Sequence, residues 1–296
     1  MLTEKIRSDF ILLLAAIIWG FAFVAQRAGM EYVGPFTFSG IRFALGFLVL
    51  IPVIAWRKKN GIDRKLLPVR ENKKIFRLQF LLGILLFGGV SFQQYGLLFT
   101  TAGNAGFITG FYVVLIPVAG LFLGHRNHFT IWIGVVLALA GLYFISVTNH
   151  FSINKGDYYV FICAIIWTFH VLLVGYLAPR TDPVRTSLVQ FGICSVLSLL
   201  VAVGWETVSL NALIDAAWTL LYGGVLSVGI AFTLQVVAQQ NAHPSYAAII
   251  LSLESVFAVL GGWLLLQEDL TPKMILGCVL MFGGMIVAQL NVNESK

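Results

Sequence analysis

The stretch Ala16-Ile17-Ile18-Trp19 occurs a second time as Ala164-Ile165-Ile166-Trp167, 148 residues further along the chain. A proline follows each tryptophan after sixteen residues. Similarity at a fixed offset is the signature of an internal structural repeat. We therefore expect two homologous units, residues 1–147 and residues 148–296.

The composition excludes an ordinary water-soluble domain. Hydrophobic residues make up 59% of the 296 positions and charged residues 11%, against about 25% charged in a typical soluble domain. The net charge is +6, but the charged residues lie mostly between apolar segments. We therefore expect no nucleic-acid partner. The three cysteines fall in separate apolar segments without zinc or disulfide spacing. We read them as core residues and expect neither a metal nor a cofactor.

Ten segments are long enough to cross a bilayer, which takes about 20 predominantly apolar residues in a helix. They are predicted near residues 10–26, 36–56, 78–99, 104–124, 129–147, 158–178, 184–203, 216–238, 244–266 and 273–290.

The distribution of Lys and Arg predicts the orientation, because cytoplasmic loops retain positive charge. If the N-terminus is cytoplasmic, the opposite side holds only Arg27, Lys155 and Lys273. The cytoplasmic side then holds Lys5, Arg7, Arg57, Lys58, Lys59, Arg64, Lys65, Arg70, Lys73, Lys74, Arg77, Arg126, Arg180, Arg185 and Lys296. Both termini are therefore expected in the cytoplasm. The basic stretch 57–77 serves as a topology signal and can contact lipid head groups.

Five spans in each unit force the second unit to cross the membrane in the opposite direction. The predicted fold class is thus an all-α integral membrane protein of ten transmembrane helices in two inverted five-helix repeats. Inverted repeats can exchange conformations, which is the physical basis of alternating access. The sequence has no G-x-x-x-x-G-K-[ST] motif for an internal nucleotide motor, so transport would be secondary or facilitated.

Further motifs resemble the drug/metabolite transporter superfamily, and within it the EamA-type permeases, over nearly the whole chain. They are the repeated Ala-Ile-Ile-Trp, Ile41-Arg42-Phe43, the run from Thr100 to Thr109 leading to Ile116-Pro117, the run from Leu251 to Ala258, Glu268, and Gly277 to Gly284. The resemblance implies ten helices in the cell membrane, the inner membrane of a bacterium. It also implies transport, often export, of small polar or amphipathic metabolites, with amino acids among the candidates.

The chain departs from that family in two places. The family often has Glu-Pro where this chain has Glu254-Ser255, and often an acidic residue where this chain has His125-Arg126. The first departure removes a residue that kinks helices.

Arg42 and Glu254 are the clearest charged residues inside predicted spans. A charge at the membrane centre costs about 2.5 to 3.5 kcal/mol on insertion scales, so it is normally paired or lines a wet cavity. The functional interpretation places both at one cavity, where Arg42 attracts a carboxylate and Glu254 attracts an ammonium or exchanges a proton. The structural alternative is a permanent ion pair, or two separate polar caps between helices.

Aromatic and neutral polar residues complete the candidate substrate site. Trp19 and Trp167 can form the floor of a cavity or serve as packing anchors, and His170 can carry a proton or bond to one neighbour. Gln190 holds in the second unit the position of Arg42 in the first. Further hydrogen-bonding candidates are Gln93, Gln94, Tyr95, Tyr112 and Gln235.

Other functional classes stay open at this point. A flippase for a lipid-linked substrate would need a lateral opening, and a membrane sensor or assembly protein would lack a polar cavity. An intramembrane enzyme would be expected to have a cluster of acidic or histidine residues. Such residues are isolated from one another within the apolar segments of this sequence. Membrane lipids and a small-molecule substrate are the expected partners, with proton coupling and a homodimer as further candidates.

Overall fold

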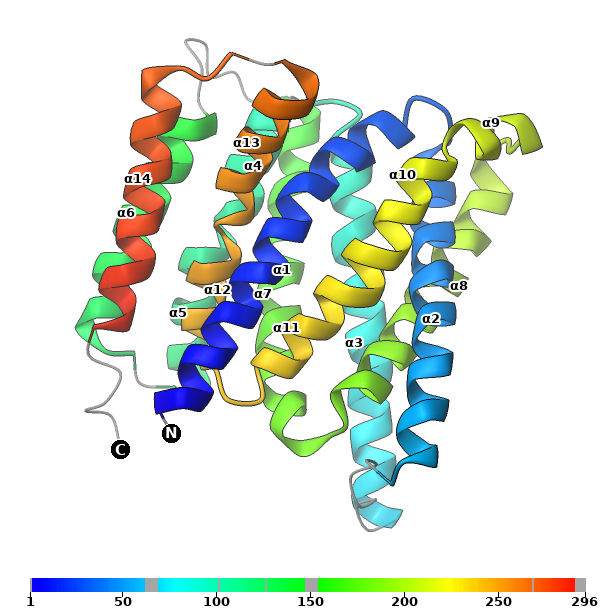
Figure 1. Ribbon diagram of the computed structural model, residues 1–296, viewed down its shortest axis with the longest axis horizontal. Helices are drawn as coiled ribbons and strands as arrows, with labels where there is room; N and C mark the ends of the chain where they lie inside the picture. Colours follow the sequence, from blue (N-terminus) through cyan, green and yellow to red (C-terminus); the bar gives the residue numbers. More distant parts are fainter. Residues whose placement is uncertain are drawn as a thin grey trace.

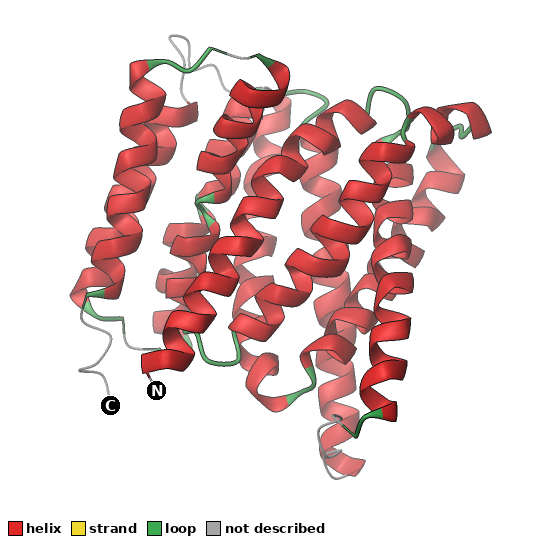
Figure 2. Cartoon of the chain, in the orientation of Figure 1, coloured by secondary structure: helices red, strands yellow, loops and turns green. Residues whose placement is uncertain are grey.

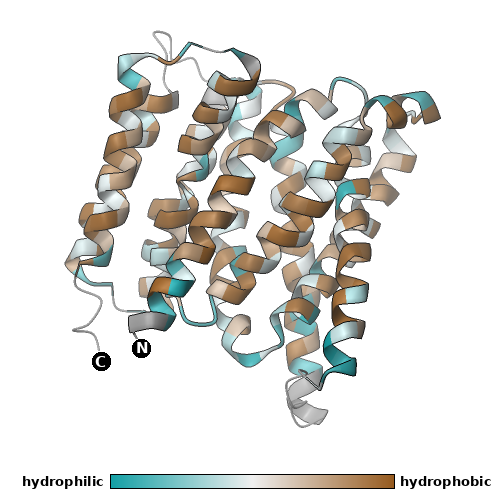
Figure 3. Cartoon of the chain, viewed as in Figure 1, coloured by the Kyte–Doolittle hydropathy of each residue, from teal (hydrophilic) through white to brown (hydrophobic). Residues whose placement is uncertain are grey.

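The computed structural model describes residues 2–61, 69–100, 102–125, 127–146, 154–267 and 269–290. Every regular element in these ranges is a helix, and no strand occurs in them (Figure 2). Brown, hydrophobic residues fill the middle of the bundle in Figure 3, while the hydrophilic ones gather at its two ends. A lipid bilayer selects for this distribution, because backbone groups must be satisfied within the helices there.

The helices agree with the ten predicted spans to within a few residues at most ends. Their bounds are α1 (Leu2–Gly29), α2 (Pro35–Lys59), α3 (Val69–Gly96), α4 (Ala102–Gly110), α5 (Tyr112–Phe122), α6 (Phe129–Ser146), α7 (Lys155–Leu177), η1 (Ala178–Arg180), α8 (Pro183–Trp205), α9 (Leu210–Asp215), α10 (Ala217–Leu221), η2 (Tyr222–Phe232), α11 (Thr233–Ala238), α12 (Pro244–Leu251), α13 (Glu254–Leu266) and α14 (Pro272–Gln289). In the described ranges, nine helical stretches have the length and hydropathy to cross a membrane, and α6 is a shorter apolar helix. The predicted fold class is confirmed in its ten helices.

Three of the ten crossings are interrupted near the middle. The fourth breaks at Phe111 between α4 and α5, and the eighth passes through the π-helical segment η2. The ninth breaks at Ser252 and Leu253, where the Ser252 hydroxyl donates to the carbonyl of Ile249 at 2.8 Å. A serine hydroxyl bonded to its own helix competes with the backbone ladder. This crossing is therefore interrupted although Ser255 stands where the family often has a proline.

Helices of the two units pack against one another in matching pairs. α2 packs on α8, and α6 packs on α14. The contact of α3 with α7 has its counterpart in the contact of α1 with η2 and α11, since the units exchange the first crossing with the sixth and the third with the eighth. The α1 and α10–α11 crossings lie side by side at the front of Figure 1. The core is thus formed between the units.

Glycines allow close contact between α6 and α14. A methyl group on Gly141 of α6 would lie 2.6 Å from the carbonyl oxygen of Gly277 in α14, and one on Gly134 would lie 2.8 Å from that of Gly284. Two helices approach to backbone contact only where such small residues face each other.

Polar contacts join both ends of the α2–α8 pair. Glu206, which follows α8, accepts hydrogen bonds from the Phe36 and Thr37 amides at 2.8 and 2.7 Å and so caps α2. At the other end, Arg57 forms a two-pronged ion pair with Asp182, the N-cap of α8, with bonds of 3.0 and 2.6 Å. The two helices are therefore fixed to each other at both membrane surfaces.

The start of α1 and the end of α14 lie at the same end of the bundle (Figure 1). We call this the terminal end and the opposite one the far end. The expected unit boundary at 147/148 lies outside the described residues. The same holds for Arg64, Lys65, Arg126, Glu268 and Lys296, and for the side chain of Arg70.

Candidate functional site

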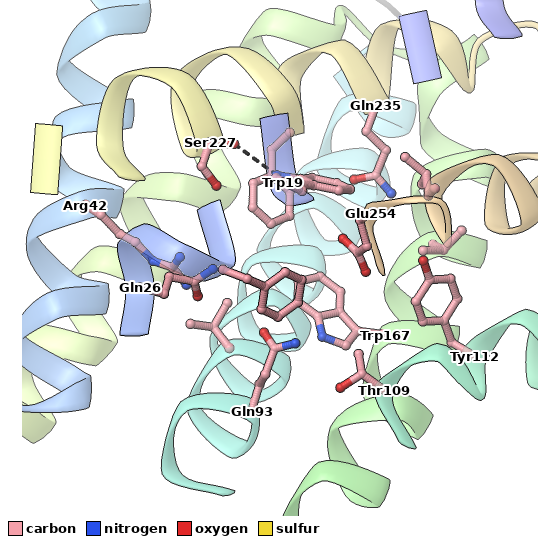
Figure 4. Close-up of a pocket in the computed structure, with 15 residues that line it drawn as sticks. Trp19, Gln26, Arg42, Gln93, Thr109, Tyr112, Trp167, Ser227, Gln235 and Glu254 are labelled. Carbon is pink, nitrogen blue, oxygen red and sulfur yellow. Dashed lines mark hydrogen bonds between the residues drawn. The ribbon is translucent and has the colours of Figure 1, made fainter. Parts of the chain in front are cut away.

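A cavity lies between the two units, around the interruptions of the fourth, eighth and ninth crossings (Figure 4). It contains about 600 Å³ of empty space, including the part open to solvent. Its lining residues are Trp19, Phe23, Gln26, Arg42, Val90, Gln93, Thr109, Tyr112, Trp167, Val171, Ser227, Phe232, Gln235, Leu251 and Glu254. They stand in the middle of their helices or toward the far end.

Repeat-related residues from both units line this cavity. Trp19 corresponds to Trp167 and Phe23 to Val171, at the offset of 148 residues. In the interrupted fourth and ninth crossings, Thr109 matches Leu251 and Tyr112 matches Glu254, both 142 residues apart. The cavity therefore lies on the axis that relates the two units, where alternating access requires a substrate site.

Arg42 supplies a cation to the first-unit wall. Its side chain is 3% exposed, and its guanidinium lies 5.2 Å from the ring centre of Phe43 and 5.6 Å from that of Phe38. These aromatic faces attract a cation without neutralising it. The Nε atom is buried without a hydrogen-bond partner, and in Figure 4 the side chain points toward Gln26.

Glu254 supplies a carboxyl group to the second-unit wall, as the first residue of α13. The helix break just before it places the carboxylate at a helix N-terminus, where the helix dipole favours negative charge. Figure 4 shows the carboxylate in the cavity between Gln235 and Trp167. In the described part of the chain, neither Glu254 nor Arg42 forms an ion pair, so the alternative of a permanent pair between them does not describe this conformation.

Aromatic rings form the centre of the cavity wall. Phe232 of η2 lies between the two tryptophans, 4.6 Å from the Trp19 ring centre and 6.0 Å from that of Trp167. The Trp19 indole N–H donates to the carbonyl of Ser227 at 3.2 Å. Trp19 therefore fixes the π-helical segment to α1 while its ring faces the cavity.

Neutral polar atoms without partners also face the cavity. The Thr109 hydroxyl and the Gln235 side-chain oxygen are buried and make no hydrogen bond. Buried polar atoms are nearly always paired. These two are therefore positions where a bound molecule or water would bond.

Four candidate residues lie outside the lining, namely Gln94, Tyr95, His170 and Gln190. Gln94 donates to the Gln26 side chain at 2.8 Å, and its neighbour Gln93 faces the cavity instead. His170 and Gln190 are fully buried and share a hydrogen bond of 2.9 Å. The sequence interpretation of His170 as a buried histidine with one bonded neighbour thus describes its position.

Several lining residues had not been singled out from the sequence. Phe23 and Gln26 follow Trp19 by four and seven residues and so share its helix face. That spacing could have indicated them. Ser227 and Phe232 lie on η2, where the π-helical turn displaces side chains from the ordinary helical spacing. Nothing in the sequence indicated that turn.

Taken together, the cavity presents one cation, one carboxylate, aromatic rings and neutral hydrogen-bonding groups. No cluster of three or more metal-ligating side chains occurs among the described residues. Such a lining suits a molecule of mixed polarity that carries opposite charges at two places.

Comparison with known proteins gives the family. The chain matches the EamA-like transporter family over residues 6–147 and again over residues 154–289. The chain belongs to the EamA-like transporter family. The expected resemblance to this family is confirmed, and the membrane-length apolar helices described above agree with a transporter.

Two relatives of this EamA-like chain are transporters by name. An "Uncharacterized transporter" of Archaeoglobus fulgidus is 32% identical and covers 98% of this chain and 88% of its own length. The "Uncharacterized transporter YoaV" of Bacillus subtilis is 25% identical, covering 95% and 96%. A protein of known crystal structure superimposes with a TM-score of 0.76 at 21% identity over 96% of this chain and 98% of its own, which shows a shared fold.

Proposed function

We propose that this EamA-like protein is a secondary transporter that moves small polar or amphipathic metabolites, such as amino acids, across the cell membrane by alternating access. The observation that carries the proposal is the cavity on the repeat axis, with Arg42 on one wall and Glu254 on the other. Its aromatic and neutral groups would contact the rest of the substrate. The function is transport rather than catalysis.

The unpaired charges support a bound molecule of opposite polarity. A charge inside a membrane span without a partner is unfavourable by several kcal/mol. A substrate carboxylate near Arg42 and a substrate ammonium near Glu254 would relieve both. An entirely apolar substrate would relieve neither, which is why a zwitterionic or amphipathic metabolite fits best.

The orientation completes the proposal. The excess of Lys and Arg in segments at the terminal end favours a cytoplasmic location of that end. The far end would then face the outside of the cell. Because the cavity residues lie in the middle and toward the far end, the cavity would face outward. One relative is named as an inner membrane transporter, of Escherichia coli, and we place this chain in the corresponding bacterial membrane.

Uptake into proteoliposomes tests the proposal. A labelled mixture of amino acids and small metabolites is offered under an imposed pH gradient to the wild type, Arg42→Gln and Glu254→Gln. We expect saturable uptake of at least one compound, with a loss of tenfold or more in each variant. Arg42→Gln introduces the residue type that the second unit has at the equivalent position, Gln190. It removes the charge and keeps a polar side chain.

A position-matched control separates cavity chemistry from folding. Gln190→Ala changes the repeat-equivalent position, which does not line the cavity, and should retain uptake. Equal uptake by all four proteins would remove both charges from the mechanism. Absence of uptake of every compound, with folded protein in the vesicles, would contradict metabolite transport.

A further inference from the structure

The two ends of the bundle are packed differently. At the terminal end α5 packs on α12, with Val113 and Ile116 in the same buried cluster as Tyr246 and Ile249. The repeat-equivalent contact at the far end would join α13 to α4. In the described part of the chain those two helices make almost no contact. The α5–α12 contact is thus the closed gate of this conformation, if the protein works by the transport cycle proposed above.

A polar cluster joins the loops next to this gate, formed by His125 and Asn127 after α5 and by His243 and Ser245 at the start of α12. We call it the gate cluster. Asn127 accepts a hydrogen bond from the Ser245 hydroxyl at 2.9 Å and donates one to the Pro117 carbonyl at 3.0 Å. The ring centres of His125 and His243 are 5.1 Å apart. The gate cluster therefore links α5 directly to α12.

His243 holds the start of α12 in its neutral form. Its Nδ1 atom accepts a hydrogen bond from the Ser245 amide at 3.3 Å, as the N-cap of the helix. A protonated ring could not accept this bond. It would also place a positive charge at a helix N-terminus, where the dipole disfavours it, and beside His125.

The surroundings of His243 keep it neutral at ordinary pH. Burial, and to a lesser extent the nearby His125, lower the pKa of His243 from 6.5 to about 4. Among the described residues, Tyr246 is a further titratable group against its ring, at 6.1 Å between ring centres. From α1, Lys5 lies over the Tyr246 ring and Asp9 lies near Lys5. From α7, the neighbour of Pro244 is Gly175, which carries no charge.

We propose that the gate cluster is a proton-operated latch, in which protonation of His243 releases α12 from α5 and opens the terminal end. The direction of the pH effect follows from the proton affinity of the ring in the latched and released forms. The latched form binds a proton only near pH 4, whereas a solvent-exposed histidine does so near pH 6.5, so acid favours the released form. Between pH 7.5 and pH 5 the ratio of released to latched protein should rise by up to roughly 30-fold. The rise stops below about pH 4.

Distance measurements between spin labels test the latch without any substrate. Labels on Leu123→Cys, after α5, and Asn241→Cys, before α12, report the gate in a background with the three native cysteines changed to alanine. Both positions are exposed. In nanodiscs at pH 7.5 we expect one short distance, and at pH 5 a second, longer one.

Two substitutions of histidine by asparagine sharpen the test. His243→Asn keeps a side-chain acceptor for the N-cap but cannot take up a proton, so it should hold the short distance at both pH values. His128 caps α6 in a similar way, with its Nδ1 atom 3.4 Å from the Thr130 amide, and is not a member of the gate cluster. His128→Asn should respond to pH like the wild type.

An unchanged distance in the wild type between pH 7.5 and pH 5 would overturn the latch, and so would a full pH response in His243→Asn. Failure of the latch is distinguishable from failure of the proposed function. Uptake that is lost in Arg42→Gln, together with a label distance that does not change between pH 7.5 and pH 5, would support transport without the latch. A pH-dependent distance in a protein that takes up no compound would leave a proton-sensitive gate without metabolite transport.

Discussion

Glu206 shows how much a single side chain contributes to the fold. Its carboxylate caps α2 from the end of another helix, and Gly34 lies so close that a methyl group there would meet the carboxylate. Loss of a helix cap costs about 1 to 2 kcal/mol. We expect Glu206→Ala to lower the free energy of unfolding by about that amount, measured by thermal or denaturant unfolding in detergent.

Gly34→Ala provides the matched test of the same cap. The added methyl group should displace the carboxylate, so Gly34→Ala alone destabilises, while adding it to Glu206→Ala changes little further. Such non-additivity is the mark of a shared interaction. Additive effects in the double variant would show that Gly34 and Glu206 act separately.

Hydrogen bonds from the side chains of Trp19 and Tyr222 connect α1 with η2. The Trp19 indole donates to Ser227 O at 3.2 Å, and the Tyr222 hydroxyl donates to Ile18 O at 3.0 Å, so both join α1 to η2. Trp19→Phe and Tyr222→Phe should each lower stability by about 1 kcal/mol, the usual net value of a hydrogen bond. Melting temperatures equal to that of the wild type would show that water replaces these donors.

The site residues illustrate what sequence can and cannot reveal. Arg42 and Glu254 were recognisable because a charge inside an apolar span is rare, and they do line the cavity. Gln93 and Gln94 were not separable, because neighbours on a helix point about 100° apart and no pattern fixed the rotation of α3. Only the packed structure shows that Gln93 faces the cavity while Gln94 bonds to Gln26.

At the scale of elements, the α6–α14 pair depends on glycine. Gly141 faces the carbonyl of Gly277, whereas Gly283 of α14 has open space around it. Gly141→Ala should destabilise by about 1 to 3 kcal/mol through overpacking, and Gly283→Ala should be neutral or slightly stabilising because alanine favours helix. Unfolding measurements on the two variants compare the same chemical change in one helix pair.

The ten crossings were predictable because each is a long apolar segment, and a membrane admits few other structures. Their interruptions were not predictable. The breaks at Phe111 and Ser252 occur without a proline at the break, and Pro117 lies within α5. What decides them is the packing of the two units and a local bond such as that from Ser252 to Ile249, neither of which hydropathy records.

For the whole molecule, the unequal ends predict which cross-links form. Ile116 and Ile249 belong to one buried cluster at the closed end. Their repeat equivalents, Ala258 and Phe107, lie on α13 and α4, which scarcely meet. We expect oxidation to join Ile116→Cys to Ile249→Cys readily and to stop uptake. Electrophoresis of a chain cut between the units reports the bond.

Phe107→Cys and Ala258→Cys serve as the complementary pair. In a protein that alternates, they should cross-link slowly, and faster under conditions that open the terminal end. Equal rates for the two pairs would contradict a structure that is closed at one end only.

The unequal walls of the cavity have a consequence for the orientation of a substrate. A dimer of two identical five-helix units would carry two arginines at the position of Arg42, or none, and its two walls would bear the same charge. In this chain each unit has its own sequence, so Arg42 differs from Gln190, and Glu254 from Tyr112. The difference between the units thus allows an electric field across the cavity, which two identical units could not produce and which would align a dipolar substrate in one direction.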